Sequence, residues 1–348
     1  MKRLSIIVPI YNVEPYLERC LRSLEDQDIP REDYEIICIN DGSPDDSRSV
    51  VIRMQTENEN ITLIEQDNGG VSRARNKGIE NANGKYILFI DPDDYVDSKC
   101  FNRILANADN HDAQVAFLGF TVLDENGTIR NQVFNANYSF RVFTGIETYY
   151  LARGNGRTDP DRLWAVLIKS EFLNYHKLQY LGDVPYLEDG ELIARILCLA
   201  TCCTFDGHSF YQRTTRPGSA TNSNLFNSPK ATNGFLSAAM NLKRFQNEEY
   251  LNEEQRYFLN QPICKFVLLA VRSALRKPYY KNYSKIRDEL IINNLSKVDI
   301  KGVVKPYIYY AFLYNNMTIA FLIIAHFKET KLILKQTLNS IKALNIKG

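Results

Sequence analysis

The sequence predicts an α/β fold with a mixed, mainly parallel sheet flanked by helices, followed by a helical C-terminal region. Three observations support this prediction. Short apolar runs alternate with stretches of helical spacing at the start of the chain, polar residues follow each of these runs, and strand signals stop near residue 225. Strands that alternate with helices form parallel sheets through right-handed crossovers, and both faces of such sheets are buried.

The early apolar runs are rich in Ile, Val, Leu and Tyr, which favour strands, and they cover residues 4–8, 34–39, 61–64 and 86–90. The intervening stretches have the spacing of amphipathic helices over residues 13–24, 45–54 and 71–81. Further strands are expected over 115–120, 121–123 and 132–134, with a hairpin-type turn at Glu125-Asn126-Gly127. A helix over 187–199, a strand over 201–205 and a polar loop over 214–223 complete this part.

The pattern changes at about residue 225 and predicts two domains. Beyond this point the sequence has helical spacing over 235–245, 263–276 and 286–292 and no strand signal. A chain of 348 residues is long enough for two domains, since domains typically contain roughly 100 to 200 residues. We therefore expect a sheet-containing domain over 1–224 and a helical domain over 225–348.

Composition excludes several classes of protein and partner. Hydrophobic residues make up 45% and charged residues 24%, as in globular proteins with a full core. Lysine plus arginine (42) nearly balance aspartate plus glutamate (41), so the overall charge predicts no nucleic-acid partner. The seven cysteines show no CxxC pair and are typical of core residues in a reducing compartment. The first apolar run is too short for a signal peptide, and we expect a cytoplasmic location.

The last forty residues carry a pattern with two interpretations. Residues 307–327 are apolar, but Asn315-Asn316 interrupt them, and the unbroken part is shorter than the ~20 residues of a spanning helix. After Glu329, four lysines alternate with Leu and Ile, at positions 331, 335, 342 and 347. This basic amphipathic pattern fits peripheral contact with the inner face of a membrane, or packing on the rest of the chain.

Three carboxylates follow the fourth predicted strand in Asp91-Pro92-Asp93-Asp94. Like charges at the end of a buried strand repel one another unless a cation or a proton intervenes. A divalent ion such as Mn²⁺ or Mg²⁺ is therefore the predicted partner of these carboxylates, because hard oxygen ligands suit these ions, which also bind substrate phosphates. Capping of the next helix by the same aspartates is the alternative.

Two more polar clusters follow predicted strands, and ligands bind at the edge where the carboxyl ends of parallel strands meet. Asp41, in Asn40-Asp41-Gly42-Ser43, can accept an N–H from a pyrimidine ring, although a turn with a helix cap explains the same residues. Asn68-Gly69-Gly70 precede Arg73 and Arg75 at a helix start. Glycine lets the backbone approach a ligand and arginine suits phosphate, while a solvated basic helix face is the alternative.

Together these segments resemble the inverting nucleotide-sugar glycosyltransferases of the GT-A fold, often called family 2. The matching pieces lie within roughly residues 3 to 100 and are Ser5 to Asn12, Asn40 to Ser43, Asn68 to Gly78 and Asp91 to Asp94. The resemblance implies that Asp93 binds the metal ion, that Asp91 lies near the ribose or the metal, and that Asp94 supports them. It also implies that the donor is held by Pro9, Tyr11, Asn12, Asp41, Asn68, Gly69, Arg73 and Arg75, of which Pro9, Tyr11 and Asp41 frame the nucleobase.

The segment from Leu187 to Leu192 is similar to the Glu-Asp motif of this family. The similarity implies that Asp189 is the general base for the acceptor hydroxyl and that Glu188 orients it. Leu192 stands where many relatives carry an aromatic residue, and helix capping by acids explains the same motif.

Two other segments resemble the family. Trp164, the single tryptophan, suits either sugar stacking or the core. Arg213 or Arg216, beside Pro217-Gly218-Ser219, suits either closure over the diphosphate or an exposed loop.

The resemblance implies inverting transfer of a sugar from a nucleotide diphosphate donor, with UDP favoured, to a hydroxyl of a saccharide or lipid-linked acceptor in cell-surface polysaccharide synthesis. A catalytically silent module that binds nucleotide sugars and a nucleotidyltransferase are the alternatives. A dehydrogenase is not supported, because Pro9-Ile10-Tyr11-Asn12 lacks the glycine fingerprint that follows the first strand of dinucleotide-binding folds.

Overall fold

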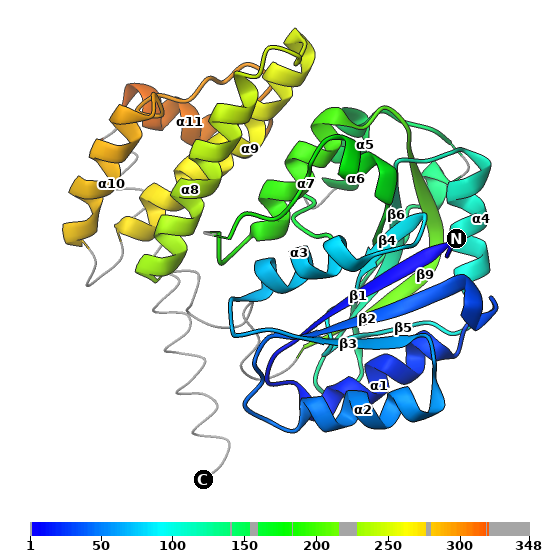
Figure 1. The fold of residues 1–348 in the computed structure, drawn as a ribbon. Coiled ribbons are helices and arrows are strands. Elements are labelled where there is room, and N and C mark those ends of the chain that lie inside the picture. The colour runs from blue at the N-terminus through cyan, green and yellow to red at the C-terminus, as the bar shows by residue number, and fades with distance from the viewer. Residues whose placement is uncertain are drawn as a thin grey trace. The chain divides into compact units, whose positions relative to one another are not determined.

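The computed structural model describes residues 2–139, 141–153, 159–182, 184–215, 228–275, 280–317 and 319. The chain forms two compact units, Met1–Asn222 and Ser223–Gly348. Figure 1 shows a sheet with helices on its faces in the first unit and a group of helices in the second. The boundary between the units in the chain lies near the residue at which the sequence pattern changes.

The first half of the sheet is parallel, with the strand order β3-β2-β1-β4. These strands are β1 (Leu4–Ile10), β2 (Tyr34–Asn40), β3 (Ile61–Glu65) and β4 (Tyr86–Phe89). Every residue of β1, β2 and β4 is buried, which explains their almost continuous apolar runs. The four predicted early strands and their parallel pairing are confirmed.

The second half of the sheet is mixed and continues from β4 in the order β8-β6-β9-β5, with β7 beside β6. The strands are β5 (Tyr95–Val96), β6 (Val115–Leu123), β7 (Ile129–Val133), β8 (Val166–Lys169) and β9 (Cys203–Thr214). The two strands predicted over 115–123 are one strand, β6, which pairs with β7 across the predicted turn at Gly127. Strand β8 is antiparallel to β4 and β6 and was not predicted, because its four residues carry no distinctive turn signals.

Helices cover both faces of the sheet in the first unit. Figure 1 shows α1 (Glu14–Glu25) and α2 (Ser47–Glu57) on one side and α3 (Val71–Asn81) on the other. Helix α3 packs so closely on β1 that a Cβ added at Gly78 would lie 2.3 Å from the Ile7 side chain. The remaining helices of this unit are α4 (Phe101–Asn110), α5 (Gly145–Arg153), α6 (Ser170–Tyr175), α7 (Glu188–Leu199) and the 3-10 turns Arg31–Asp33 and Ala136–Tyr138.

The described part of the second unit is helical, as predicted, and consists of α8 (Pro229–Gln246), α9 (Glu253–Ala274), α10 (Tyr280–Ile292) and α11 (Tyr307–Asn316). Helix α9 begins with a capping box of Asn252 and Gln255, which satisfies free N–H groups of its first turn. Among the helices of the described residues, none combines the length and the apolar character that crossing a membrane requires. The basic segment after Glu329 lies outside the described residues, so its contact with a membrane stays a prediction.

Candidate active site

A cleft of about 450 Å³ opens where the carboxyl ends of β1, β2 and β4 meet. Of the residues predicted from the sequence, those that line it are Pro9, Tyr11, Asp41, Asn68, Arg75, Asp91, Asp93 and Glu188. Asp94, Arg213 and Thr214 also contribute to its walls. Four predicted residues do not line the cleft, namely Asn12, Gly69, Arg73 and Asp189. The predicted sheet edge is therefore the site of the cleft.

Tyr11 lies at the wall of the cleft, and its side chain is 50% exposed. An exposed aromatic ring offers an apolar face on which a planar base can stack. The next residue, Asn12, has a positive φ of 53°, and its backbone N–H donates to Ser43 Oγ at 3.3 Å. Asn12 therefore shapes the turn after β1 and is not itself part of the cleft wall.

Asp41 is buried at the end of β2, and its carboxylate organises the loop that precedes α3. Its Oδ1 accepts hydrogen bonds from Gln66 Nε2 (2.7 Å) and Gly69 N (2.8 Å), and its Oδ2 accepts from Gly70 N (2.8 Å). Gly70 has a φ of +86°, a conformation that favours glycine. A carboxylate oxygen can accept two hydrogen bonds, so Oδ2 keeps capacity for a donor in the cleft.

Gly69 and Arg73 form the outer side of this loop. A Cβ at Gly69 would lie 2.3 Å from Arg73 Cδ, so the arginine side chain lies directly over the glycine. Arg73 is exposed and outside the cleft wall, while Gly69 acts on the site through its N–H to Asp41.

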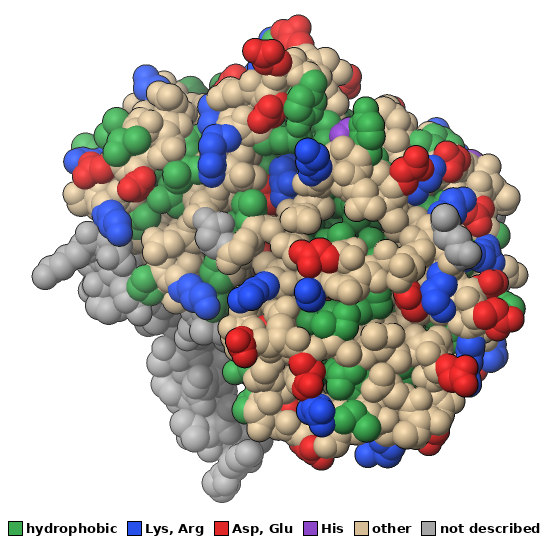
Figure 2. Space-filling model, in the orientation of Figure 1, with side chains coloured by type: hydrophobic (Ala, Val, Ile, Leu, Met, Phe, Trp, Pro, Cys, Tyr) green, Lys and Arg blue, Asp and Glu red, His purple; other side chains and the backbone are tan. Residues whose placement is uncertain are grey.

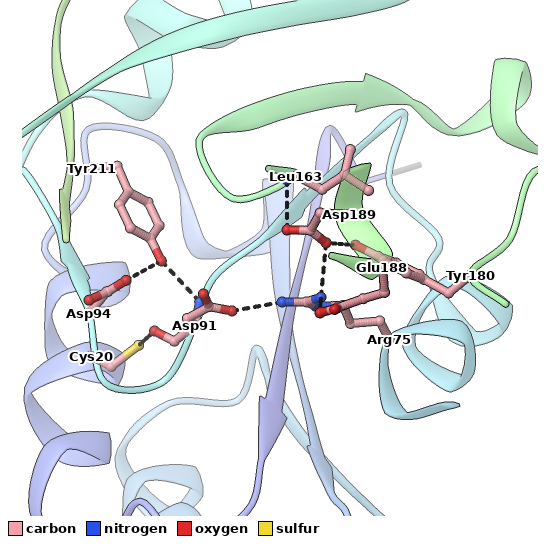
Figure 3. A network of polar contacts seen from close by, with 9 residues as sticks. All are labelled: Cys20, Arg75, Asp91, Asp94, Leu163, Tyr180, Glu188, Asp189 and Tyr211. Atoms are coloured by element: carbon pink, nitrogen blue, oxygen red, sulfur yellow. Dashed lines mark hydrogen bonds and ion pairs between the residues drawn. The ribbon is translucent and has the colours of Figure 1, made fainter. Parts of the chain in front are cut away.

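Arg75 joins three carboxylates, one in the loop after β4 and two at the start of α7 (Figure 3). Its Nη2 donates to Asp91 Oδ1 at 2.9 Å, and its Nη1 lies 3.0 Å from both Glu188 Oε1 and Asp189 Oδ1. The side chain is only 4% exposed, so these ion pairs are shielded from water. The arginine that the sequence assigned to the donor phosphates or base therefore connects the end of β4 to the start of α7.

Asp189 is held by three donors on α3 and two loops. Its Oδ1 also accepts a hydrogen bond from the Tyr180 hydroxyl at 3.0 Å, and its Oδ2 accepts one from Leu163 N at 3.0 Å. The loop that contains Leu163 approaches α7 closely, since a Cβ at Gly190 would lie 2.5 Å from Asp161 Oδ1. No sequence signal marked Tyr180 as a partner of the predicted base.

Strand β9 fixes the acidic loop after β4. The Tyr211 hydroxyl donates to Asp94 Oδ2 at 2.7 Å and accepts from Asp91 N at 3.2 Å (Figure 3). The Thr214 N–H donates to Asp94 Oδ1 at 2.6 Å. Asp94 thus ties the loop to β9, and it lines the cleft together with Asp91 and Asp93.

The site carries more negative charge than its buried arginine balances. Burial, aided by the charges of Asp91 and Asp93, raises the pKa of Asp94 to about 8. Burial and the charge of Asp189 raise the pKa of Glu188 to about 7, although Arg75 opposes this shift. Burial also raises the pKa of Asp91. A cation bound beside these carboxylates would relieve their mutual repulsion.

The described residues contain no group of three or more His, Cys, Asp or Glu side chains that converges as a metal site. Mg²⁺ and Mn²⁺, however, are often held by only one or two carboxylates together with substrate phosphates. Asp91 and Asp93 line the same cleft and supply such hard oxygen atoms. These residues fit a divalent ion that protein and diphosphate bind jointly.

Trp164 packs beside the cleft among other aromatic side chains. Its ring centroid lies 4.9 Å from that of Tyr211 and 5.0 Å from that of Phe120, and the Arg213 guanidinium lies 5.7 Å from its ring. Arg213 itself lines the cleft. The other predicted closing residues, Arg216 and Pro217-Gly218-Ser219, lie outside the described residues.

Comparison with known proteins gives a family and a set of relatives. The model of glycosyl transferase family 2 matches residues 5–161. The uncharacterized glycosyltransferase EpsJ of Bacillus subtilis is 37% identical over 186 residues, which cover 53% of this chain and 53% of EpsJ. The poly(ribitol-phosphate) beta-N-acetylglucosaminyltransferase TarS of Staphylococcus aureus is 32% identical over 119 residues, which cover 34% of this chain and 21% of TarS. The matches span about half or less of the curated relatives' length.

The fold is also shared with a solved structure. The crystal structure of S. aureus TarS 1-349 in complex with UDP-GlcNAc matches with a TM-score of 0.69 at 17% identity, covering 94% of this chain and 92% of that one. The matched residues include the predicted motifs after β1, β2 and β4 and the glycine-arginine loop before α3. Residues 5–161 of this chain therefore match glycosyl transferase family 2, and the sheet-containing unit has the GT-A fold.

Proposed function

We propose that this chain is an inverting, divalent-cation-dependent glycosyltransferase that transfers a sugar from a UDP-linked donor to a hydroxyl of a saccharide or lipid-linked acceptor. One observation carries the proposal: Arg75 holds the predicted base Asp189 and the predicted donor residue Asp91 within one ion cluster beside the cleft. The cluster brings a group that can accept the acceptor's proton to the place where a diphosphate can bind. Both functions are needed for transfer in a single step.

The donor site in this proposal uses the residues along the sheet edge. Tyr11 and Pro9 contact the base, and Asp41 Oδ2 accepts the ring N–H of uracil. Asp93 and Asp91 would hold Mn²⁺ or Mg²⁺, which would supply positive charge for binding the diphosphate. Arg213, which also lines the cleft, adds charge for binding the phosphates. The TarS structure in complex with UDP-GlcNAc supports the choice of uridine.

Transfer then proceeds by one displacement. Asp189 Oδ2 takes the proton of the acceptor hydroxyl, whose oxygen attacks the anomeric carbon as the bond from that carbon to the diphosphate oxygen breaks. The electron pair of the broken bond leaves with UDP. Arg75, Tyr180 and the Leu163 N–H fix the carboxylate, so the base is oriented before the acceptor arrives. The anomeric configuration inverts because no protein nucleophile intervenes.

Relatives that modify poly(ribitol-phosphate) support a cell-surface polymer as the acceptor class. A cytoplasmic enzyme that meets its acceptor at the inner face of the membrane agrees with this class.

The test uses a panel of UDP-, GDP- and dTDP-sugars with purified protein, in Mn²⁺ or in chelator, for the wild type and Asp93→Asn. We expect cation-dependent release of UDP from a UDP-sugar and a loss of at least about 100-fold in the variant, since a removed metal ligand weakens transition-state charge stabilisation. Donor binding without turnover would favour a silent binding module. Formation of nucleotide sugar with release of pyrophosphate would favour a nucleotidyltransferase. No binding to any nucleotide sugar would contradict the proposal.

A further inference from the structure

Arg162 is a buried arginine in the loop that precedes β8, and it is only 8% exposed. Its guanidinium lies over three aromatic rings, 4.6 Å from the centroid of Phe120, 5.4 Å from Phe117 and 5.5 Å from Trp164. Its Nε and Nη2 atoms are buried and have no hydrogen-bond partner within the described residues. Arg162 therefore has aromatic faces around it but no counterion in the described part of the chain.

Other buried arginines of the same unit are paired. Arg75 contacts Asp91, Arg153 lies 2.7 Å from Asp159, and Arg195 lies 2.7 Å from Glu191. Burying a charged group is costly unless a partner compensates, and contact with aromatic rings compensates only in part. The lack of a counterion at Arg162 is thus an exception that a bound anion would remove.

Arg162 directly precedes a residue that hydrogen-bonds to the predicted base. Its neighbour Leu163 donates its N–H to Asp189 Oδ2 at 3.0 Å. Its other contact, Trp164, packs on Tyr211, whose hydroxyl binds Asp94 and the Asp91 N–H. Trp164 also contacts Arg213, a residue of the cleft wall. Arg162 and the cleft-wall residue Arg213 therefore both contact the Trp164 ring, and Arg162 directly precedes the residue whose N–H orients Asp189.

We propose that Arg162 binds a phosphate group of the acceptor, beside the hydroxyl that Asp189 deprotonates. The inference rests on the proposed transfer reaction and adds the substrate class, a phosphate-bearing acceptor. The two unpartnered nitrogens, Nε and Nη2, lie on one edge of the guanidinium, the edge that can donate two parallel hydrogen bonds to one oxyanion. The aromatic walls exclude water and strengthen such a charge-assisted contact.

The arginine keeps its charge under working conditions. Burial lowers the pKa of Arg162 to about 10, which still leaves the guanidinium protonated at pH 7. Because its free edge is covered, an anion must displace a covering side chain to reach it. Trp164 is the single tryptophan of the chain, so its fluorescence reports a change at this place.

The experiment titrates the full chain with glycerol 3-phosphate and follows tryptophan fluorescence, with glycerol and with sodium chloride of equal ionic strength as controls. We expect a saturable change with glycerol 3-phosphate alone, which persists in saturating UDP. In Arg162→Met, which keeps an unbranched apolar stem without the charge, the apparent affinity should fall at least about tenfold, since a charge-assisted contact is lost. Arg213→Met distinguishes two positions of the anion. The apparent affinity falls in this variant if the anion binds at the cleft wall, and it is retained if the anion binds at Arg162.

Three results would overturn the inference: no response in the wild type, a response that UDP abolishes, or an unchanged response in Arg162→Met. UDP binding and the melting temperature show whether Arg162→Met is folded. If it is not, Arg162→Lys retains the charge without the two-donor edge and should still weaken the response several-fold. UDP binding is measured separately, so failure of the donor site and failure of the phosphate site are distinguishable.

Discussion

Arg75 and Asp189 form a buried ion pair, with 3.0 Å between Nη1 and Oδ1, although they are separated by more than a hundred positions in the sequence. The same guanidinium reaches Asp91 at 2.9 Å through its other terminal nitrogen. The loop after β4 and the start of α7 are therefore held in fixed relation by one side chain. In the proposed reaction, this relation sets the distance between the donor diphosphate and the base.

Replacing Arg75 tests this relation. In Arg75→Met, three carboxylates lose their shared cation, and breaking a buried pair typically costs about 3 to 5 kcal/mol of folding free energy. We expect a lower denaturation midpoint and a fall in kcat of at least about 100-fold, because the base loses its orientation. Chemical denaturation and steady-state kinetics measure the two effects.

Arg73→Met is the matched control on the same helix, since Arg73 is exposed and outside the cleft wall. Its free energy of unfolding should stay within about 0.5 kcal/mol of wild type. Equal losses in the two variants would show that Arg75 has no special role.

The raised pKa of Glu188 predicts that the free energy of unfolding depends on pH. Its pKa is raised from 4.5 to about 7, so between these values the folded protein binds a proton that the unfolded chain has lost. Stability from this group is complete below pH 4.5 and declines as the pH rises to 7, by at most about 3 kcal/mol. Glu188→Gln lacks this titration, so the variant should gain stability relative to wild type as the pH rises through this window.

Urea denaturation of both proteins at several pH values measures the difference in unfolding free energy. A difference that is constant from pH 4.5 to 7 would contradict a raised pKa for Glu188. Glu171→Gln serves as control, because the Glu171 side chain is 82% exposed and outside the active-site cleft.

The Tyr211 hydroxyl offers a test of whether β9 fixes the acidic loop after β4. Tyr211→Phe removes the hydroxyl that binds both Asp94 and the Asp91 N–H, which leaves two buried polar groups without this partner and costs about 1 to 3 kcal/mol. We expect a raised KM for the nucleotide sugar, because the loop with Asp91 and Asp93 is less well fixed. Tyr175→Phe, at a side chain that is 80% exposed, should change neither stability nor KM. An unaltered KM in Tyr211→Phe would remove β9 from the account of donor binding.

The parallel half of the fold could be predicted because its signals are local. Strands β1 to β4 are short apolar runs, and each ends in polar residues that topology brings to one edge. The same logic placed Asp41, Asp91 and Asp93 together, and all three line the cleft. Strand β8 escaped prediction because it is short and owes its place to pairing with β4 and β6.

The partners of the site residues could not be predicted in the same way. Tyr180 binds Asp189 across a turn, and the Leu163 N–H reaches it from another loop, so neither contact follows a sequence period. The arginine at position 75 was expected near the phosphates or the base because guanidinium groups suit anions. In the structure its partners are three carboxylates, which are also anions. Whether an arginine contacts carboxylates or phosphates depends on tertiary packing, which the sequence pattern does not show.

The close contact between Gly190 of α7 and the Asp161 side chain predicts that the Asp161 loop helps to position the base. A Cβ at Gly190 would lie 2.5 Å from Asp161 Oδ1 and 2.9 Å from its Cγ, closer than real Cβ contacts, so the Asp161 side chain must shift in Gly190→Ala. Leu163, two residues further on, donates its N–H to Asp189 Oδ2, and this hydrogen bond should lengthen or break. We expect kcat to fall about tenfold or more. The KM for the donor should change little, because most of the proposed donor residues lie in the loops after β1, β2 and β4 and not beside α7.

Gly182→Ala is the matched control for this substitution, since nothing lies within 4 Å of a Cβ added at Gly182. Steady-state kinetics of the two alanine variants, with circular dichroism to confirm that both are folded, separates the contact from a general effect of alanine. If Gly190→Ala keeps wild-type kcat, the Leu163 N–H does not orient the base, and Arg75 and Tyr180 suffice to hold Asp189. If kcat and donor KM change together, the shift of Asp161 also affects the donor site, and Gly190 does not act on the base alone.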